Sequence, residues 1–174
     1  MPFTPFHFGP GAAIQAVFPK QLSFIAFALG NVLMDFEPAY YMLTGQFPLH
    51  RFFHSFLGAT LVVPIVVFMF VAARRIAVGR EWVPNLYDWL GLTVRQVCLG
   101  ATIGVYSHIV LDGIMHSDMQ PFAPFSSLNP FLHLLPLDRL HWLCAGAAVL
   151  AFGVAMVRLG RSVSTASEEC DSAK

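Results

Sequence analysis

Charged residues are scarce in this chain, and this scarcity is the first indication of its class. Only 11% of the 174 residues are charged, 56% are hydrophobic, and the mean hydropathy is +0.64. An ordinary soluble domain carries about 25% charged residues. The composition therefore excludes such a domain and predicts one integral membrane domain. The formal net charge is zero, and basic residues cluster only beside the apolar segments, which argues against nucleic-acid binding.

Paired cysteines and several common catalytic motifs are also missing. The three cysteines form no CxxC spacing, so we expect neither a disulfide framework nor a thiolate metal site. The chain has no glycine-rich phosphate loop, HExxH motif or GxSxG motif. These absences disfavour nucleotide hydrolysis and the commonest peptidase and lipase mechanisms. No basic region precedes the first apolar run, so we expect no cleaved signal peptide.

Long apolar runs are abundant. Residues 52–73, 94–115 and 140–157 are each long enough to cross about 30 Å of hydrocarbon, which requires about 20 helical residues. Pro19 and Lys20 interrupt a further apolar stretch at 11–34, which predicts a helical hairpin; one long kinked helix is the alternative. We predict an all-α polytopic membrane bundle with about five membrane helices. Residues 1–159 form this domain, and the polar residues 160–174 form a disordered cytoplasmic tail.

Lysine and arginine are distributed unequally between the two ends of the predicted bundle. Arg51 and Arg139 lie at one end. The other eight basic residues lie at the opposite end: Lys20, Arg74, Arg75, Arg80, Arg95, Arg158, Arg161 and Lys174. The positive-inside rule assigns the end with eight basic residues to the cytoplasm. The end with Arg51 and Arg139 then faces the outside.

Ionisable residues gather near this outer end, where such groups are costly within apolar segments and usually functional. His50 with His54, and His108 with Asp112 and His116, have the four-residue spacing that places side chains on one helical face. The hairpin brings His7 to the depth of Asp35. The predicted metal ligands are His7, Asp35, His50, His54, His108, Asp112 and His116.

Imidazole and carboxylate donors without thiolate suit Zn²⁺ in a catalytic site, and they also permit Mn²⁺ or Fe²⁺. We expect one or two ions to neutralise the crowded carboxylates. A bound ion lowers the pKa of coordinated water from about 15.7 to about 7 and so supplies hydroxide. We predict Glu37 and Asp118 as catalytic carboxylates. Glu37 is the general base in this interpretation, just beyond a helix end at Pro38. The alternative for His116 and Asp118 is a simple solvated loop.

Arginine grips phosphate oxygens through a planar fork of donors. Arg51 and Arg139 are therefore candidate substrate-binding residues for an anionic phosphoester. In the alternative interpretation, Arg51 pairs with Glu37, and Arg139 pairs with Asp138 or extends to the interface. The proline- and phenylalanine-rich segment 120–136 is a candidate lid over the site.

The order of these motifs resembles the YdjM-type family of inner-membrane proteins, described as membrane-bound metal-dependent hydrolases. The resemblance rests on His7, DFE at residues 35–37, HRFFHS at 50–55 and SHIVLD at 107–112. It implies that His7, Asp35, His50, His54, His108 and Asp112 are the metal-site residues, and that the protein lies in a bacterial inner membrane. The chain departs from the family pattern at Phe6, where a threonine is usual, and at Glu37, where an aspartate is usual.

We therefore predict a membrane-bound hydrolase that uses metal-activated water on an ester or phosphoester bond of a lipid or lipid-linked substrate. Its partners are the lipid bilayer and that substrate. A metal transporter or metal-binding sensor is the first alternative, but it requires polar residues to continue toward the cytoplasm. A scaffold with a structural polar cluster is the second.

Overall fold

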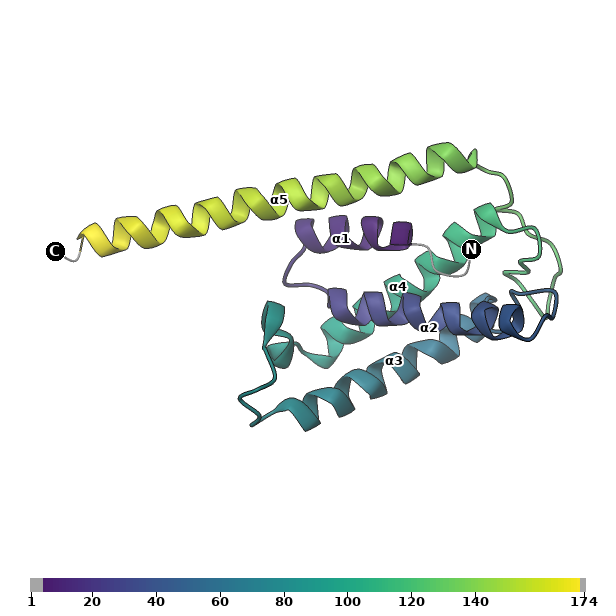
Figure 1. Ribbon diagram of the computed structural model, residues 1–174, viewed down its shortest axis with the longest axis horizontal. Coiled ribbons are helices and arrows are strands. Elements are labelled where there is room, and N and C mark those ends of the chain that lie inside the picture. The colour runs from purple at the N-terminus through teal and green to yellow at the C-terminus, as the bar shows by residue number, and fades with distance from the viewer. Residues whose placement is uncertain (1–4, 173–174) are drawn as a thin grey trace.

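The computed structural model describes residues 5–172, with the side chains of residues 6–85 and 88–158. In chain order, its elements are the 3₁₀ helix η1 (Pro5–His7), α1 (Phe8–Val17), α2 (Phe24–Leu43), α3 (Phe56–Ala77), the 3₁₀ helix η2 (Leu86–Gly91), α4 (Val94–Met115) and α5 (Leu137–Ser172). The described residues contain helices and no strand, which confirms the all-α prediction (Figure 1).

The predicted N-terminal hairpin is confirmed. α1 ends at Val17 and α2 begins at Phe24, and the two helices run side by side in Figure 1. The Ser23 hydroxyl caps α2 by accepting a hydrogen bond from the Ala26 backbone N–H at 3.1 Å, which satisfies one of the free donors of the first turn. The alternative of one kinked helix is therefore wrong, and His7 lies at the same end of the bundle as Asp35.

Helices α2, α3 and α4 share one apolar core, which includes Met34, Val66 and Val105. α2 and α4 cross closely because α4 presents glycine to α2. A Cβ atom at Gly104 would lie 2.4 Å from the Phe27 carbonyl oxygen, and one at Gly100 would lie 2.1 Å from the Ser23 carbonyl oxygen. α1 covers α2, and α5 packs along α1 (Figure 1).

Three helices within the described residues are long and apolar enough to cross a membrane: Phe56–Ala77, Val94–Met115 and Leu137–Arg158. α1 has only 10 residues, and α2 carries Asn31, Asp35 and Glu37 within its apolar sequence. The five predicted helices are thus present. Three of them have the length and composition of membrane spans.

α5 continues well beyond the predicted end of its span. It remains helical through Ser172, whereas we expected disorder from residue 160. Extending a helix that is already formed requires no new nucleation, which is the most costly step of helix formation. Residues 173 and 174, and the side chain of Arg161, lie outside the described part of the chain.

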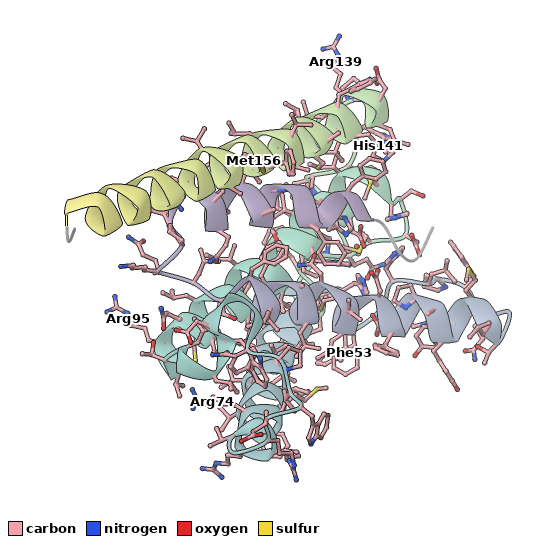
Figure 2. The ribbon with its side chains drawn as sticks, turned by 60° about the vertical axis from the view of Figure 1, so that its left-hand side comes forward. Phe53, Arg74, Arg95, Arg139, His141 and Met156 are labelled. Carbon is pink, nitrogen blue, oxygen red and sulfur yellow. The ribbon has the colours of Figure 1, made fainter. Side chains whose placement is uncertain are left out.

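The two ends of the bundle differ in chemistry. Arg74 and Arg95 lie where α3 ends and α4 begins (Figure 2). The loops that join α2 to α3 and α4 to α5 lie at the opposite end, together with η1 (Figure 1). The predicted metal ligands gather at this second end.

Candidate metal centre

Four separate parts of the chain bring the predicted ligands together. His7 comes from η1, Asp35 from α2, and His108 and Asp112 from α4, while His50 and His54 come from the α2–α3 loop. All six are buried, with exposed fractions from 0% at His54 and His108 to 7% at Asp35. A polar group is rarely buried to this extent without a partner, so the cluster needs a specific explanation.

Asp112 lies at the centre of the cluster. Its Oδ1 atom is 3.2 Å from His7 Nε2, and its Oδ2 atom is 3.1 Å from His108 Nε2. The Nε2 atoms of His50 and His54 are each 3.8 Å from Oδ2. The spacing prediction for His108 and Asp112 on one helical face is thus confirmed by the structure.

The opposite nitrogen of three of these rings has its own partner. His54 Nδ1 donates to Glu37 Oε2 at 2.8 Å, and His50 Nδ1 donates to Asp118 Oδ1 at 2.9 Å. His108 Nδ1 donates to Asn31 Oδ1 at 3.2 Å. A neutral imidazole that carries its proton on Nδ1 presents a lone pair on Nε2. These partners therefore direct Nε2 lone pairs toward Asp112.

Three of the inward-facing nitrogens have no hydrogen-bond partner. They are the Nε2 atoms of His7, His54 and His108. The Nδ1 atom of His7 also has no partner, so only the rings of His54 and His108 are held with the Nε2 lone pair inward. An unsatisfied buried acceptor costs about 1–3 kcal/mol, and lone pairs that face a carboxylate repel it. A cation among these atoms removes both costs. The donor set of imidazole nitrogens and carboxylate oxygens also fits zinc, so the residues present fit the metal that the sequence predicts.

The α2–α3 loop owes its conformation to two acidic residues. Glu37 accepts hydrogen bonds from the backbone N–H groups of Arg51, Phe53 and His54. Asp118 Oδ2 accepts from the N–H groups of Leu49 and His50. The backbone N–H groups of this loop thus donate to carboxylates and not to the carbonyl groups of a helix.

The predicted helical position of His50 and His54 is therefore wrong. Helix α3 begins only at Phe56, after Ser55 caps it by accepting from the Gly58 N–H at 3.1 Å. The two rings nevertheless meet, with centroids 4.8 Å apart. Their proximity comes from the loop and not from helical spacing.

Glu37 also lies elsewhere than we expected. It is inside α2, which continues through Pro38 to Leu43, and not beyond a helix end. Proline removes one backbone donor, yet α2 remains helical past Pro38. Glu37 Oε2 accepts from the His54 ring and from the N–H groups of Arg51 and His54, and Oε1 accepts from the Phe53 N–H.

His116 and Asp118 lie at the rim of the cluster, just after α4 ends at Met115. The His116 ring stacks on His50, with centroids 4.4 Å apart, and its Nε2 is 4.0 Å from Asp112 Oδ1. Burial lowers the pKa of His116 below its ordinary value, which keeps the imidazole neutral. Burial alone would raise the pKa of Asp118, but the hydrogen bonds from His50 lower it, so this carboxylate is ionised.

His54 is the most strongly perturbed of the loop histidines. Burial lowers its pKa to about 4, against the opposing effect of the Glu37 hydrogen bond. The ring is therefore neutral at ordinary pH. A neutral imidazole is the form that binds a metal ion.

Sequence reasoning missed the role of Asn31. Its side chain donates to the Phe27 carbonyl at 2.9 Å and accepts from His108. A signal for it exists, since Asn31 is a polar residue in an apolar helix, four residues before Asp35 and thus on the same face.

The two candidate substrate-binding arginines differ in position. Arg51 lies in the α2–α3 loop, where it donates to the Pro48 carbonyl and stacks 3.7 Å over the Tyr41 ring. The alternative pairing of Arg51 with Glu37 is not made by the guanidinium, and only the backbone N–H of Arg51 donates to the Glu37 carboxylate. Arg139 is exposed in the first turn of α5 and points away from the bundle (Figure 2). The structure does not bring Arg139 to the cluster.

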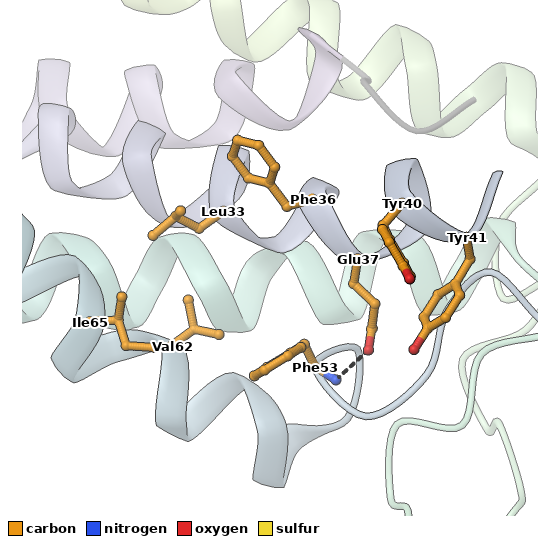
Figure 3. A pocket seen from close by; sticks show the side chains of 8 residues that line it. All are labelled: Leu33, Phe36, Glu37, Tyr40, Tyr41, Phe53, Val62 and Ile65. Atoms are coloured by element: carbon orange, nitrogen blue, oxygen red, sulfur yellow. Dashed lines mark hydrogen bonds between the residues drawn. The ribbon is translucent and has the colours of Figure 1, made fainter. Parts of the chain in front are cut away.

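A pocket of about 330 Å³ lies beside the cluster, between α2 and α3. Its walls are mainly apolar, and Glu37, Tyr40 and Tyr41 line its polar end (Figure 3). Glu37 separates this pocket from His54, because the same carboxylate lines the pocket and accepts from the His54 ring.

The fold and the cluster together define a class: a helical membrane protein whose buried histidines and aspartates can hold a metal ion. The family comparison agrees with this class. The family model for the YdjM inner membrane protein matches residues 3–167, so the chain belongs to the YdjM family. Comparisons with curated proteins and with solved structures each give no match.

Proposed function

We propose that this protein is a metal-dependent hydrolase of the inner membrane, with zinc as its most compatible ion. The observation that carries the proposal is the set of buried Nε2 atoms on His7, His54 and His108, which face Asp112 without a hydrogen-bond partner. The proposed ligands are His7, Asp35, His50, His54, His108, Asp112 and His116. When bound, the ion supplies a water molecule with a lowered pKa.

We propose that Glu37 and Asp118 act as positioning residues, through His54 and His50. Histidine ligands usually donate their second nitrogen to a carboxylate or carbonyl, which fixes the ring and raises its basicity. Glu37 and Asp118 make such bonds. Glu37 Oε2 accepts three hydrogen bonds from the loop, whereas Oε1 accepts one, from the Phe53 N–H, and so keeps a free lone pair.

The proposed substrate is a lipid or lipid-linked ester or phosphoester. The apolar pocket between α2 and α3 supports this class, because it lies one side chain away from the cluster and suits an acyl chain. Arg51 is adjacent to the polar end of the pocket through its contact with Tyr41. A guanidinium there favours an anionic headgroup.

The proposed site faces the outer side of the membrane. Its end of the bundle carries the loops with few basic residues, whereas Lys20, Arg74 and Arg95 follow the other end. The positive-inside rule favours the cytoplasm for the latter. A substrate in the outer leaflet would then meet the cluster directly.

The alternative of a metal transporter has less support. A conduit needs polar groups along a path to the far side. Away from the cluster, the buried residues of α4 are Val97, Gly100, Ala101, Gly104 and Val105. This apolar face favours a site at one end of the bundle.

The test begins with full-length protein purified in detergent without chelators. We expect stoichiometric metal by elemental analysis. We also expect phosphate or acid release from vesicles of phosphatidic acid or phosphatidylglycerol, lost with EDTA and restored by Zn²⁺. The His108→Gln variant should bind less metal and lose the activity. Absence of bound metal, or hydrolysis that survives in His108→Gln, would overturn the proposal. Metal binding without any ester cleavage would favour the transporter or sensor.

A further inference from the structure

Two sets of ligand atoms in the cluster share Asp112, and a third set, of His50, His116 and Asp118, lies at the rim. The atoms that His7, His108 and Asp112 offer all lie within 4.8 Å of one another, and so do those of His50, His54 and Asp112. Among the described residues, His7 and His108 do not join His50 and His54 in one set whose ligand atoms all lie within 4.8 Å of one another. One ion cannot therefore be reached by both pairs without a change in the backbone or side chains.

Asp112 has the geometry to serve both sets. Its Oδ1 atom is nearest to His7 Nε2, at 3.2 Å, while its Oδ2 atom is 3.8 Å from the Nε2 atoms of both loop histidines. His108 Nε2 also lies close to Oδ2, at 3.1 Å, and is 3.7 Å from Asp35 Oδ1. Each set thus contains a pair of imidazoles and access to the central carboxylate, and the first set has Asp35 in addition.

The charge of the region agrees with two cations. Asp35, Glu37, Asp112 and Asp118 gather at this end of the bundle, and every ion pair found among the described residues joins one of them to a histidine. None of these ion pairs includes a lysine or arginine side chain. Two divalent ions offset the negative charge of these crowded carboxylates, and a shared carboxylate reduces the repulsion between neighbouring ions.

We propose that the protein holds two divalent ions side by side, with Asp112 bridging them. His7, His108 and Asp35 serve one position, and His50 and His54 serve the other. The proposal rests on the proposed metal site and goes further by fixing the number of ions and the division of ligands. Two-metal sites clamp both the attacking and the leaving oxygen of a phosphoester, so this arrangement favours phosphoesters over carboxylic esters within the proposed substrate class.

The ion count tests the division of ligands. Purified full-length protein is loaded with Mn²⁺ and freed of excess ion, and Mn²⁺ per chain is measured by elemental analysis. We expect two ions in the natural chain, one in His7→Gln, one in His54→Gln, and two in the control His133→Asn. His133 is exposed, lies outside the cluster and has a φ of 59° that asparagine tolerates.

Electron paramagnetic resonance of the same samples provides an independent measurement. Two ions bridged by Asp112 should give an exchange-coupled Mn²⁺ spectrum, which each single-histidine variant replaces with the spectrum of an isolated ion. One ion per chain, lost in both His7→Gln and His54→Gln, overturns the two-ion proposal and leaves the hydrolase proposal intact. No bound ion at all overturns the proposed function itself.

Discussion

His54 Nδ1 lies 2.8 Å from Glu37 Oε2, and this contact joins the α2–α3 loop to the middle of α2. Replacing Glu37 with glutamine keeps the size of the side chain but puts an amide donor where an acceptor is needed. We expect the affinity for Zn²⁺ to fall about 10–100-fold, the usual effect of removing a carboxylate behind a ligating histidine. Competition with a fluorescent chelator measures it.

The matched control for that experiment is Glu81→Gln. Glu81 is exposed in the loop after α3, at the end of the bundle opposite to the cluster. Its substitution should leave Zn²⁺ affinity unchanged. Equal affinities in both variants would mean that Glu37 does not position His54.

Asn31 offers a second test of positioning. Asn31→Leu removes the acceptor for His108 Nδ1 and leaves that donor buried without a partner. We expect the free energy of unfolding to fall by about 1–3 kcal/mol and the affinity for Zn²⁺ to decrease. Asn31→Asp retains an acceptor for His108, so it should recover most of the metal affinity even if stability stays low. The account is contradicted if Leu and Asp variants bind Zn²⁺ equally well.

Close packing of α2 on α4 predicts a third result. In Gly104→Ala, the new methyl group meets the Phe27 carbonyl at 2.4 Å, so the helices must separate at a cost of about 1–3 kcal/mol. The control Gly146→Ala on α5 meets nothing within 4 Å, and alanine favours helix by up to about 1 kcal/mol. Thermal unfolding in detergent should therefore show a lower Tm for Gly104→Ala and an equal or higher Tm for Gly146→Ala.

The pH dependence of stability follows from His54. Burial lowers its pKa from 6.5 to about 4 in the folded chain. The unfolded chain therefore binds a proton more readily, so the stability contributed by neutral His54 is present above pH 6.5 and is lost as the pH falls toward 4. The slope for one proton is at most about 1.4 kcal/mol per pH unit. Metal-free protein should show a falling Tm over this interval, and His54→Gln should show a smaller fall. A pH-independent Tm in the natural chain would contradict this.

Residues on regular helices could be placed from the sequence with little error. α4 was predicted at residues 94–115, and the structure has it at Val94–Met115. His108 and Asp112 therefore met as expected, because helical spacing alone decides their relation. The hairpin was predictable for a similar reason, since a proline and a lysine in an apolar run are costly except at a turn.

Residues whose positions depend on tertiary contacts could not be placed in the same way. HRFFHS has an apolar pattern compatible with helix, but Glu37 and Asp118 bind its backbone N–H groups from other parts of the chain. Nothing in the local sequence reveals those partners. The pairing of Asn31 with His108 is likewise a contact between two helices, and it became visible only once α2 and α4 were packed.

X-ray absorption spectroscopy of the purified, zinc-loaded full chain tests the central claim most directly. The account predicts a first coordination sphere of imidazole nitrogen and carboxylate oxygen at about 2.0–2.2 Å, the usual range for zinc with these donors. The imidazole signal should decrease in His108→Gln and persist in His133→Asn. Sulfur ligands, or a shell of oxygen alone with no imidazole scattering, would contradict it.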